Sequence, residues 1–308
     1  MASFFQKIFR RNNITDESNA EKSPNGEDTR PLKQRSGSTT VDQALSAPKY
    51  DPPQMLVGSG HSVGKQRDHN EDALFTMTTT LVTDSQRIPF GLFIVADGMG
   101  GHKHGEMASG IAVRAMANHV ISKLYTPMIG LPTRAPEESL QEIMQAGVQA
   151  AHRAIVKGAP GGGTTLTAVL IVGNQMTSAH VGDSRAYSIH NDGTLEVLTR
   201  DHSLVKRLEE LGQITADEAA IHPQRNVLYR ALGQGEPFDA EISTHSLPTS
   251  GFLMICSDGL WGVVNENEIL STITSTDSPA RAAQKLVEAA NNAGGPDNIS
   301  AIIVRLPD

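Results

Sequence analysis

The chain of 308 residues contains a single cysteine, Cys256. An internal disulfide, a CxxC redox pair and a zinc site built from thiolates are therefore excluded, and any bound metal must be held by oxygen or imidazole groups. Long hydrophobic runs are also missing. Apolar stretches such as residues 252–256 fall far short of the roughly 18 residues that a membrane span needs, and no secretory hydrophobic region opens the chain. We expect a soluble, cytoplasmic protein with no transmembrane span.

Positive charge is not in excess either. The sequence has 26 Lys and Arg against 34 Asp and Glu, a formal net charge of -8, which argues against a nucleic-acid partner. With 38% hydrophobic residues, a chain of this length can bury a substantial core.

Residues 1–54 differ from the rest in composition. Ser, Thr, Asn, Pro and charged residues dominate residues 12–53, a mixture that cannot offset the entropy lost on ordering. We therefore predict a disordered tail over residues 1–54 and a folded domain over residues 55–308. Residues 1–11 form a short basic amphipathic pattern, which is compatible with weak contact with a membrane surface or a partner. A frayed terminus is the alternative, because isolated helices this short are marginal.

Within the folded domain, runs of strands alternate with pairs of helices. Period-2 and β-branched patterns predict strands over residues 55–63, 73–80, 89–96, 164–172, 176–181, 186–190, 195–198, 241–246, 252–256 and 299–306. Spacings of three and four predict helices over residues 105–124 and 136–157. A polar stretch over residues 203–221 is also expected to be helical, and two more helices are expected over residues 266–273 and 280–291. This order is typical of an α+β fold in which helices cover antiparallel sheets.

Two of the apolar strands end in Asp-Gly, at Asp97-Gly98 and Asp258-Gly259. One Asp-Gly is most simply a turn. Two favour a functional site, because a carboxylate beside an apolar strand is costly unless a cation or several donors meet it. Further acids flank turns at 71–72, 183 and 297, too far apart in sequence for a local calcium loop. If the fold assembles them, their oxygens suit Mg²⁺ or Mn²⁺.

Six short motifs occur in order between residues 56 and 306. They are Arg67-x-x-Asn70-Glu71-Asp72, Asp97-Gly98-Met99-Gly100-Gly101, Gly163-Thr164-Thr165, Val181-Gly182-Asp183-Ser184-Arg185, Ser257-Asp258-Gly259-Leu260-Trp261 and Asp297-Asn298. Each is weak alone, but together they make the chain resemble the metal-dependent serine/threonine protein phosphatases of type 2C, in particular their bacterial branch. The resemblance implies a central antiparallel β-sandwich flanked by antiparallel helix pairs, in α/β/β/α layers.

The resemblance also implies two core metal ions, Mn²⁺ or Mg²⁺, and a third ion found in bacterial relatives. Their ligands would be Asp97, which bridges the core ions, Asp258 and Asp297 on the first, Glu71 or Asp72 with the Gly98 carbonyl on the second, and Asp183 with Asp258 on the third. Which of Glu71 and Asp72 ligates directly, and which acts through water, stays open.

The reaction implied is hydrolysis of phosphoserine and phosphothreonine monoesters. A phosphomonoester repels nucleophiles and hydrolyses extremely slowly without a catalyst. Two metal ions lower the pKa of a water that bridges them and neutralise the charge of the phosphoryl oxygens. The resemblance therefore implies direct attack by a metal-bridging hydroxide without a covalent intermediate. Arg67 would clamp the phosphate, because a guanidinium can bind two of its oxygens at once.

The acid that protonates the leaving group is not settled by the motifs. Animal and yeast enzymes carry a histidine where this chain has Met99. His102 or a metal-bound water could supply the proton, and a surface-loop role for His102 is the alternative. A zinc site from His102, His104 and Glu106 is disfavoured, because the HExxH pattern is absent.

Several further expectations follow. Residues 203–230 occupy the place of the family's mobile flap, which would gate substrate access, although an ordinary polar helix and loop is the alternative.

The expected partners are phosphorylated proteins, including a serine/threonine kinase and its substrates, in a signalling role. The chain is expected to be a monomer. The rival from another class is a pseudophosphatase that binds phosphorylated partners without turnover; the presence of all expected acids disfavours it. We expect Trp261 and Cys256 to be core residues.

Overall fold

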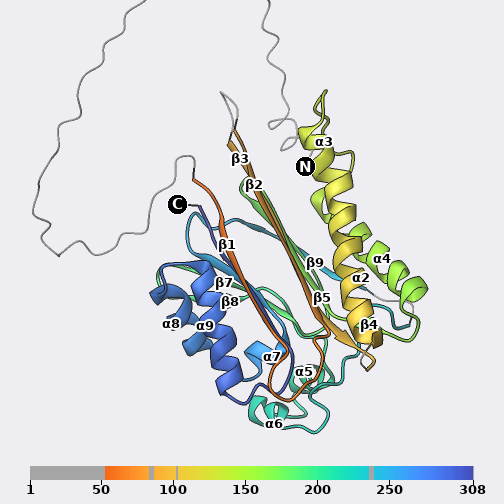
Figure 1. Ribbon diagram of the computed structural model, residues 1–308, viewed down its shortest axis with the longest axis vertical. Coiled ribbons are helices and arrows are strands. Elements are labelled where there is room, and N and C mark those ends of the chain that lie inside the picture. The colour runs from red at the N-terminus through yellow and green to blue at the C-terminus, as the bar shows by residue number, and fades with distance from the viewer. Residues whose placement is uncertain (1–52, 83–86, 102, 236–238, 308) are drawn as a thin grey trace, which may run out of the picture.

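Two antiparallel β-sheets pack face to face and carry helices on their outer faces (Figure 1). The computed structural model describes residues 53–82, 87–101, 103–235 and 239–307. Three apolar clusters separate the layers: one under each group of helices and one between the sheets. The expected α/β/β/α arrangement is confirmed.

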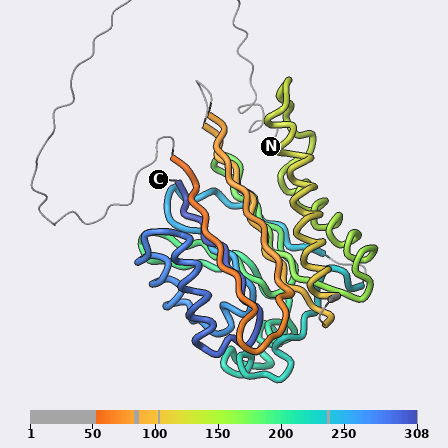
Figure 2. The backbone as a smooth tube through the Cα atoms, viewed as in Figure 1, coloured from red at the N-terminus to blue at the C-terminus, as the bar shows by residue number. Residues whose placement is uncertain are grey.

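The first sheet joins the two ends of the described chain. Its strand order is β1 (Leu56–Ser62), β11 (Ile299–Arg305), β10 (Phe252–Cys256), β7 (Arg185–Ile189) and β8 (Leu195–Val197). The first and last strands, β1 and β11, run side by side, with Leu56 opposite Arg305 (Figure 2). Helices α8 (Glu266–Ser275) and α9 (Pro279–Asn292) cover the outer face of this sheet.

The second sheet supplies the longest strands. Its order is β2 (Asp72–Val82), β3 (Arg87–Met99), β5 (Leu166–Val172), β6 (Gln175–Val181) and β9 (Glu241–Ser246), and the short β4 (Gly163–Thr164) pairs with the end of β3. Helices α2 (Lys103–Val120) and α4 (Leu140–Gly158) cover it. A π-helical turn, η1 (Ile121–Tyr125), and α3 (Thr126–Ile129) continue α2.

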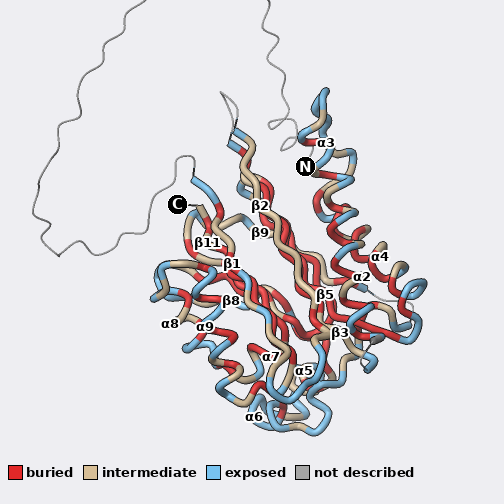
Figure 3. The backbone as a smooth tube through the Cα atoms, viewed as in Figure 1, coloured by how far each residue is buried: buried red, intermediate tan, exposed pale blue. Residues whose placement is uncertain are grey.

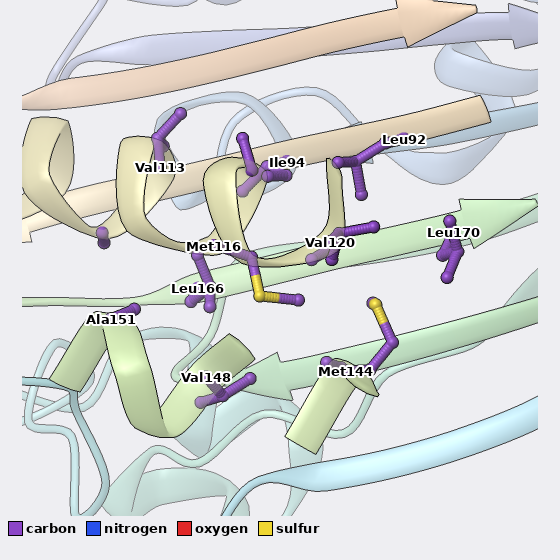
Figure 4. Packing of buried hydrophobic residues seen from close by; sticks show 14 of the residues in the cluster. Leu92, Ile94, Val113, Met116, Val120, Met144, Val148, Ala151, Leu166 and Leu170 are labelled. Atoms are coloured by element: carbon purple, nitrogen blue, oxygen red, sulfur yellow. The ribbon is translucent and has the colours of Figure 1, made fainter. Parts of the chain in front are cut away.

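Strand β3 shows why its sequence is apolar without interruption. Leu92 and Ile94 pack under α2 and α4, whereas Phe93 and Val95 point into the layer between the sheets. Both faces of the strand are therefore buried, as Figure 3 shows for the central strands. On the helix side, Met116 fills the space between these strands and α4 (Figure 4).

The structure departs from the expected elements at several points. The helix expected over residues 203–221 is two short helices, α5 (Leu204–Glu210) and α6 (Ala216–Ala220), because Gly212 adopts a φ of +68° between them. The strand expected over residues 164–172 is divided between β4 and β5. A single-turn helix, α7 (Asp258–Trp261), follows β10 and was not expected. The predicted tail lies almost wholly outside the described residues.

Candidate active site

Strand ends from both sheets bring the predicted acidic residues to one end of the molecule, the lower end in Figure 1. Asp97 stands near the end of β3, opposite Asp72 at the start of β2. Asp258 opens α7 directly after β10 and Ser257. A cleft of about 510 Å³ opens here and is lined by Arg67, Glu71, Asp97, Asp183, Asp258 and Asp297, among others. The fold therefore unites acids that the sequence separates widely.

The backbone around Asp97 is held from both sides. Its N–H donates to Thr165 Oγ1 at 2.9 Å, and its carbonyl accepts from the Thr164 hydroxyl and the Thr165 N–H at 2.8 Å each. The next residue, Gly98, has no room for a side chain, since a Cβ would lie 2.3 Å from the Gly105 carbonyl oxygen. The two threonines of the Gly-Thr-Thr motif thus anchor the Asp97 backbone, and glycine is required at the next position.

Glu71 and Asp72 occupy different places. Glu71 lines the cleft, and its Oε2 lies so close to Gly105 that a Cβ there would come within 2.0 Å. Asp72 is only 6% exposed and accepts a hydrogen bond from the Ser257 hydroxyl at 2.8 Å. This arrangement favours Glu71 as the direct ligand of the pair and places Asp72 behind it.

Asn298 ties together the loops that form one wall of the cleft. Its side-chain amide donates to the carbonyls of Val63 and His69 at 2.8 Å each, and its Oδ1 accepts from the Glu71 N–H at 2.8 Å. The sequence motif contains Asn298 but indicated no role for it. Only its position beside Asp297 could have drawn attention to it.

Arg67 reaches the cleft from the segment between β1 and β2. Its Nη2 donates to Asp297 Oδ2 at 2.7 Å, and its side chain is 49% exposed. Asp297 Oδ1 accepts a second hydrogen bond, from the Asn298 N–H at 2.8 Å. Arg67 is therefore held beside the acids yet open to a ligand from solvent.

Burial and mutual repulsion make the acidic cluster unfavourable by itself. Burial raises the pKa of Asp72 to about 7, although the hydrogen bond from Ser257 acts in the opposite direction. Burial, followed by the neighbouring carboxylates, raises the pKa values of Asp97, Asp183 and Asp258. Among the described residues, the buried Oδ1 atoms of Asp72 and Asp258 accept no hydrogen bond.

Divalent cations fit this environment. They would supply the charge that the carboxylates lack and partners for the orphaned oxygens, and an all-oxygen donor set suits Mg²⁺ and Mn²⁺. As the side chains stand, no three His, Cys, Asp or Glu within the described ranges form a finished metal cage. The fit therefore rests on the orphaned oxygens, the repulsion and the chemistry of the donors.

Some predicted residues lie elsewhere or serve the structure. His102 falls outside the described residues, so its role stays a prediction. The Cys256 thiol is buried, which raises its pKa to about 12 and excludes it as a nucleophile. The Ser184 hydroxyl lies 2.8 Å from Thr165 Oγ1, within the buried hydrogen bonds that support the strands. Trp261 packs at the edge of the core under α8 and α9, and part of its ring stays exposed.

The segment 203–230 lies beside the acids, as expected for a flap. Ser203 pairs with Leu228 across its base. A second cavity of about 690 Å³ lies between this segment and the acidic cleft, and Arg67, Asp183 and Asp258 belong to the walls of both. Gating by this segment stays a prediction.

The raised pKa values predict an unusual pH dependence for the metal-free protein. Acids whose folded pKa exceeds the unfolded value bind more protons in the folded state, so stability falls as pH rises toward that pKa. Buried His180 and His202, with pKa values lowered to about 4 and about 3, oppose this trend only below the unfolded histidine pKa near 6.5. We therefore expect stability in EDTA to keep falling between about pH 6.5 and 8, where ordinary carboxylates contribute no slope.

Urea unfolding in EDTA at several pH values would measure this slope, which can reach about 1.4 kcal/mol per pH unit for each such acid. Saturating Mn²⁺ should remove it, because a bound cation keeps the carboxylates ionised. A flat or rising stability in EDTA over this range would contradict the prediction.

Comparison with known proteins relates the chain to one family. A sequence model described as Protein phosphatase 2C matches residues 56–299, which contain all six motifs. The "Serine/threonine phosphatase stp" of Listeria innocua is 36% identical over 250 residues, covering 78% of this chain and 92% of the relative. The crystal structure of the Mycobacterium tuberculosis serine/threonine phosphatase PstP/Ppp matches with a TM-score of 0.68 and 31% identity, covering 83% of this chain and 100% of the other. The catalytic domain of PstP in complex with 2 manganese ions matches with a TM-score of 0.66 and 29% identity, covering 83% and 99%.

Proposed function

Because the chain belongs to the protein phosphatase 2C family, we propose that its acidic cleft hydrolyses phosphoserine and phosphothreonine monoesters in proteins. The activity is that of a protein serine/threonine phosphatase that depends on Mn²⁺ or Mg²⁺. The observation that carries the proposal is the convergence of buried, mutually repelling carboxylates beside one accessible arginine. Such a site is poor at binding an anion until cations occupy it, and then binds phosphate well.

The carboxylates divide naturally among the ions. Asp97, at the centre of the repulsion, would touch both core ions. Asp258 and Asp297 would complete the first, and Glu71 with the Gly98 carbonyl the second. Asp72, behind Glu71, would act through water. When bound, such ions lower the pKa of water and offset charge on the phosphoryl oxygens.

Asp183 and Asp258 are the ligands we propose for a third ion. Both line the cleft and the adjoining cavity, and the Asp258 charge helps to raise the pKa of Asp183. These two carboxylates, which would hold the third ion, are shared by the acidic cleft and the cavity beside segment 203–230.

The chain's own residues would bind and orient the substrate. Arg67 would turn its guanidinium from Asp297 toward two phosphate oxygens, which aligns the phosphorus for attack by water. Ser257 is committed to Asp72 and Cys256 is buried, so neither suits a covalent step. We propose direct hydrolysis without a phosphoenzyme. His102 would protonate the leaving serine or threonine oxygen, and a water is the alternative.

A pseudophosphatase is not favoured, since every acid required for turnover is present in the cleft or directly behind it. Phosphorylated proteins are the substrates, and we propose that a serine/threonine kinase is among its partners. We further propose a cytoplasmic monomer. Across the part of the chain that the structure describes, no helix is both long and apolar enough to cross a membrane. The basic residues 1–11 lie outside that part.

Phosphate release from a phosphothreonine peptide tests the proposal. We expect release in Mn²⁺, loss of release in excess EDTA, and recovery when Mn²⁺ is added back, because the cleft cannot hold phosphate against its own carboxylates. Release that is equal in EDTA, or that is absent at every Mn²⁺ concentration, would contradict it.

A further inference from the structure

Trp261, the only tryptophan of the chain, is bonded to the loop that carries Asp183. It is the last residue of α7, whose first residue is Asp258. Its indole N–H donates to the Asp183 backbone carbonyl at 3.0 Å. One helical turn therefore presents the Asp258 carboxylate at its start and holds the backbone of Asp183 at its end.

The indole ring is itself fixed in place by Arg185. The Arg185 guanidinium carbon lies 3.5 Å from the centre of the ring, a cation–π contact. Asp201 holds that guanidinium in turn, through bonds of 3.0 Å from Nε and 2.7 Å from Nη2. Arg185 is therefore held between Asp201 and the indole ring, and its charge offsets only part of the rise in the pKa of Asp183 that burial and Asp258 cause.

The same network reaches the base of segment 203–230. His202, next to Asp201, makes two hydrogen bonds to Gly182. Its ring Nδ1 accepts from the Gly182 N–H at 3.1 Å, and its backbone N–H donates to the Gly182 carbonyl at 2.7 Å. The loop that carries Asp183 is therefore held at two neighbouring residues. His202 is bonded to Gly182, and Trp261 is bonded to Asp183.

We propose that Trp261 is a positioning residue that sets the spacing between Asp183 and Asp258 for a divalent cation. This rests on the assignment of these two acids to one ion under the proposed function. Without the bond from Trp261 to the Asp183 carbonyl, the two buried carboxylates would move apart, because the Asp258 charge disfavours the ionised form of Asp183. This bond holds the Asp183 backbone to α7, which begins with Asp258, and it uses neither carboxylate.

Trp261→Phe is the variant that tests this. It keeps an aromatic face under Arg185 and removes only the N–H. We expect one Mn²⁺ site, the one that Asp183→Asn removes, to weaken about three- to tenfold, as for loss of one hydrogen bond, when measured by titration calorimetry on the full chain. The other sites should keep their affinity. The Mn²⁺ concentration for half-maximal activity should rise by the same factor, with kcat restored at saturating Mn²⁺.

Tyr187→Phe is the matched control. Its hydroxyl accepts from Arg185 at 3.4 Å, so the variant removes a polar group from the same network but leaves the bond to Asp183 intact. We expect its Mn²⁺ dependence to equal that of the wild type. A purely structural role for Trp261 would lower the thermal midpoint of the metal-free protein and leave the Mn²⁺ dependence unchanged, which would overturn the proposal.

Asp183→Asn separates the proposal from its premise. If Asp183→Asn loses one Mn²⁺ site and Trp261→Phe keeps that site at full affinity, the positioning role is wrong and the ion assignment stands. If Asp183→Asn binds every ion as the wild type does, the positioning role and the ion assignment are both wrong. That result would not contradict the proposed phosphatase activity, which the phosphate-release experiment tests separately. Should Trp261→Phe fail to fold, Arg185→Lys, which loses the paired bonds to Asp201, must weaken Mn²⁺ binding at the site that Asp183→Asn removes for the proposal to stand.

Discussion

Replacing Asp97 with asparagine is expected to lower kcat/KM for a phosphothreonine peptide by about 10³-fold or more. The amide keeps the size of the side chain but loses the charge that both core ions would share. Asp97 is the acid on which the repulsion of Asp72, Asp258 and Asp183 converges, so no neighbour can replace it. Steady-state kinetics with calorimetric counting of bound Mn²⁺ would measure the loss.

The same substitution is expected to stabilise the metal-free protein. Burial and repulsion raise the pKa of Asp97, so its ionised form destabilises the fold near neutral pH, and the neutral amide removes that cost. The urea midpoint in EDTA at pH 8 should therefore rise while activity disappears. Opposite changes in stability and activity are the signature of a metal ligand in a repelling cluster.

Asp277→Asn is the matched control for Asp97→Asn. Asp277 is 65% exposed, pairs with Arg281 at 3.1 Å and is absent from the walls of the cleft. Its replacement should change stability by no more than about 0.5 kcal/mol and leave kcat/KM unaltered. Activity of Asp97→Asn within tenfold of the wild type would contradict the central role of Asp97.

Replacing Arg67 with alanine is expected to lower kcat/KM about 10²-fold, mainly through KM, because a charge-assisted contact to phosphate is lost. Stability should change little, since the Arg67 side chain is 49% exposed. Mn²⁺ binding should not weaken, because Arg67 holds Asp297 at 2.7 Å and its removal frees that carboxylate for metal. Peptide kinetics and Mn²⁺ calorimetry would separate these effects.

Arg67→Lys should recover only part of this loss, because an ammonium restores the charge but not the two parallel N–H donors of a guanidinium. Arg281→Ala, which breaks the exposed 3.1 Å ion pair with Asp277 and does not touch the walls of the cleft, is the control and should leave kcat/KM unchanged. A lysine variant as active as the wild type would show that charge alone suffices, and full activity of Arg67→Ala would exclude a phosphate contact.

Local patterns were sufficient to predict most of the secondary structure. The strands predicted over residues 241–246 and 252–256 have these bounds in the structure, because period-2 and apolar runs between turn residues depend only on near neighbours. The helix expected over residues 136–157 begins later, at Leu140, where Ser139 and Glu142 form a capping box. The single turn α7 escaped prediction because four residues are too few for a helical period.

The acids and Arg67 that line the cleft are all contained in the sequence motifs, although their catalytic and metal-binding roles stay predictions. Their arrangement could not be predicted. The hydrogen bonds from Asn298 to His69 and from Trp261 to Asp183 join residues 229 and 78 positions apart, and no local pattern records such pairs.

The sequence by itself thus determined which chemical groups are available and the order of strands and helices. Only the tertiary structure decided that Glu71 faces the cleft while Asp72 lies behind it, and that Trp261 braces Asp183. The physical reason is that burial and repulsion between carboxylates depend on distances in space, which the packing of the two sheets sets.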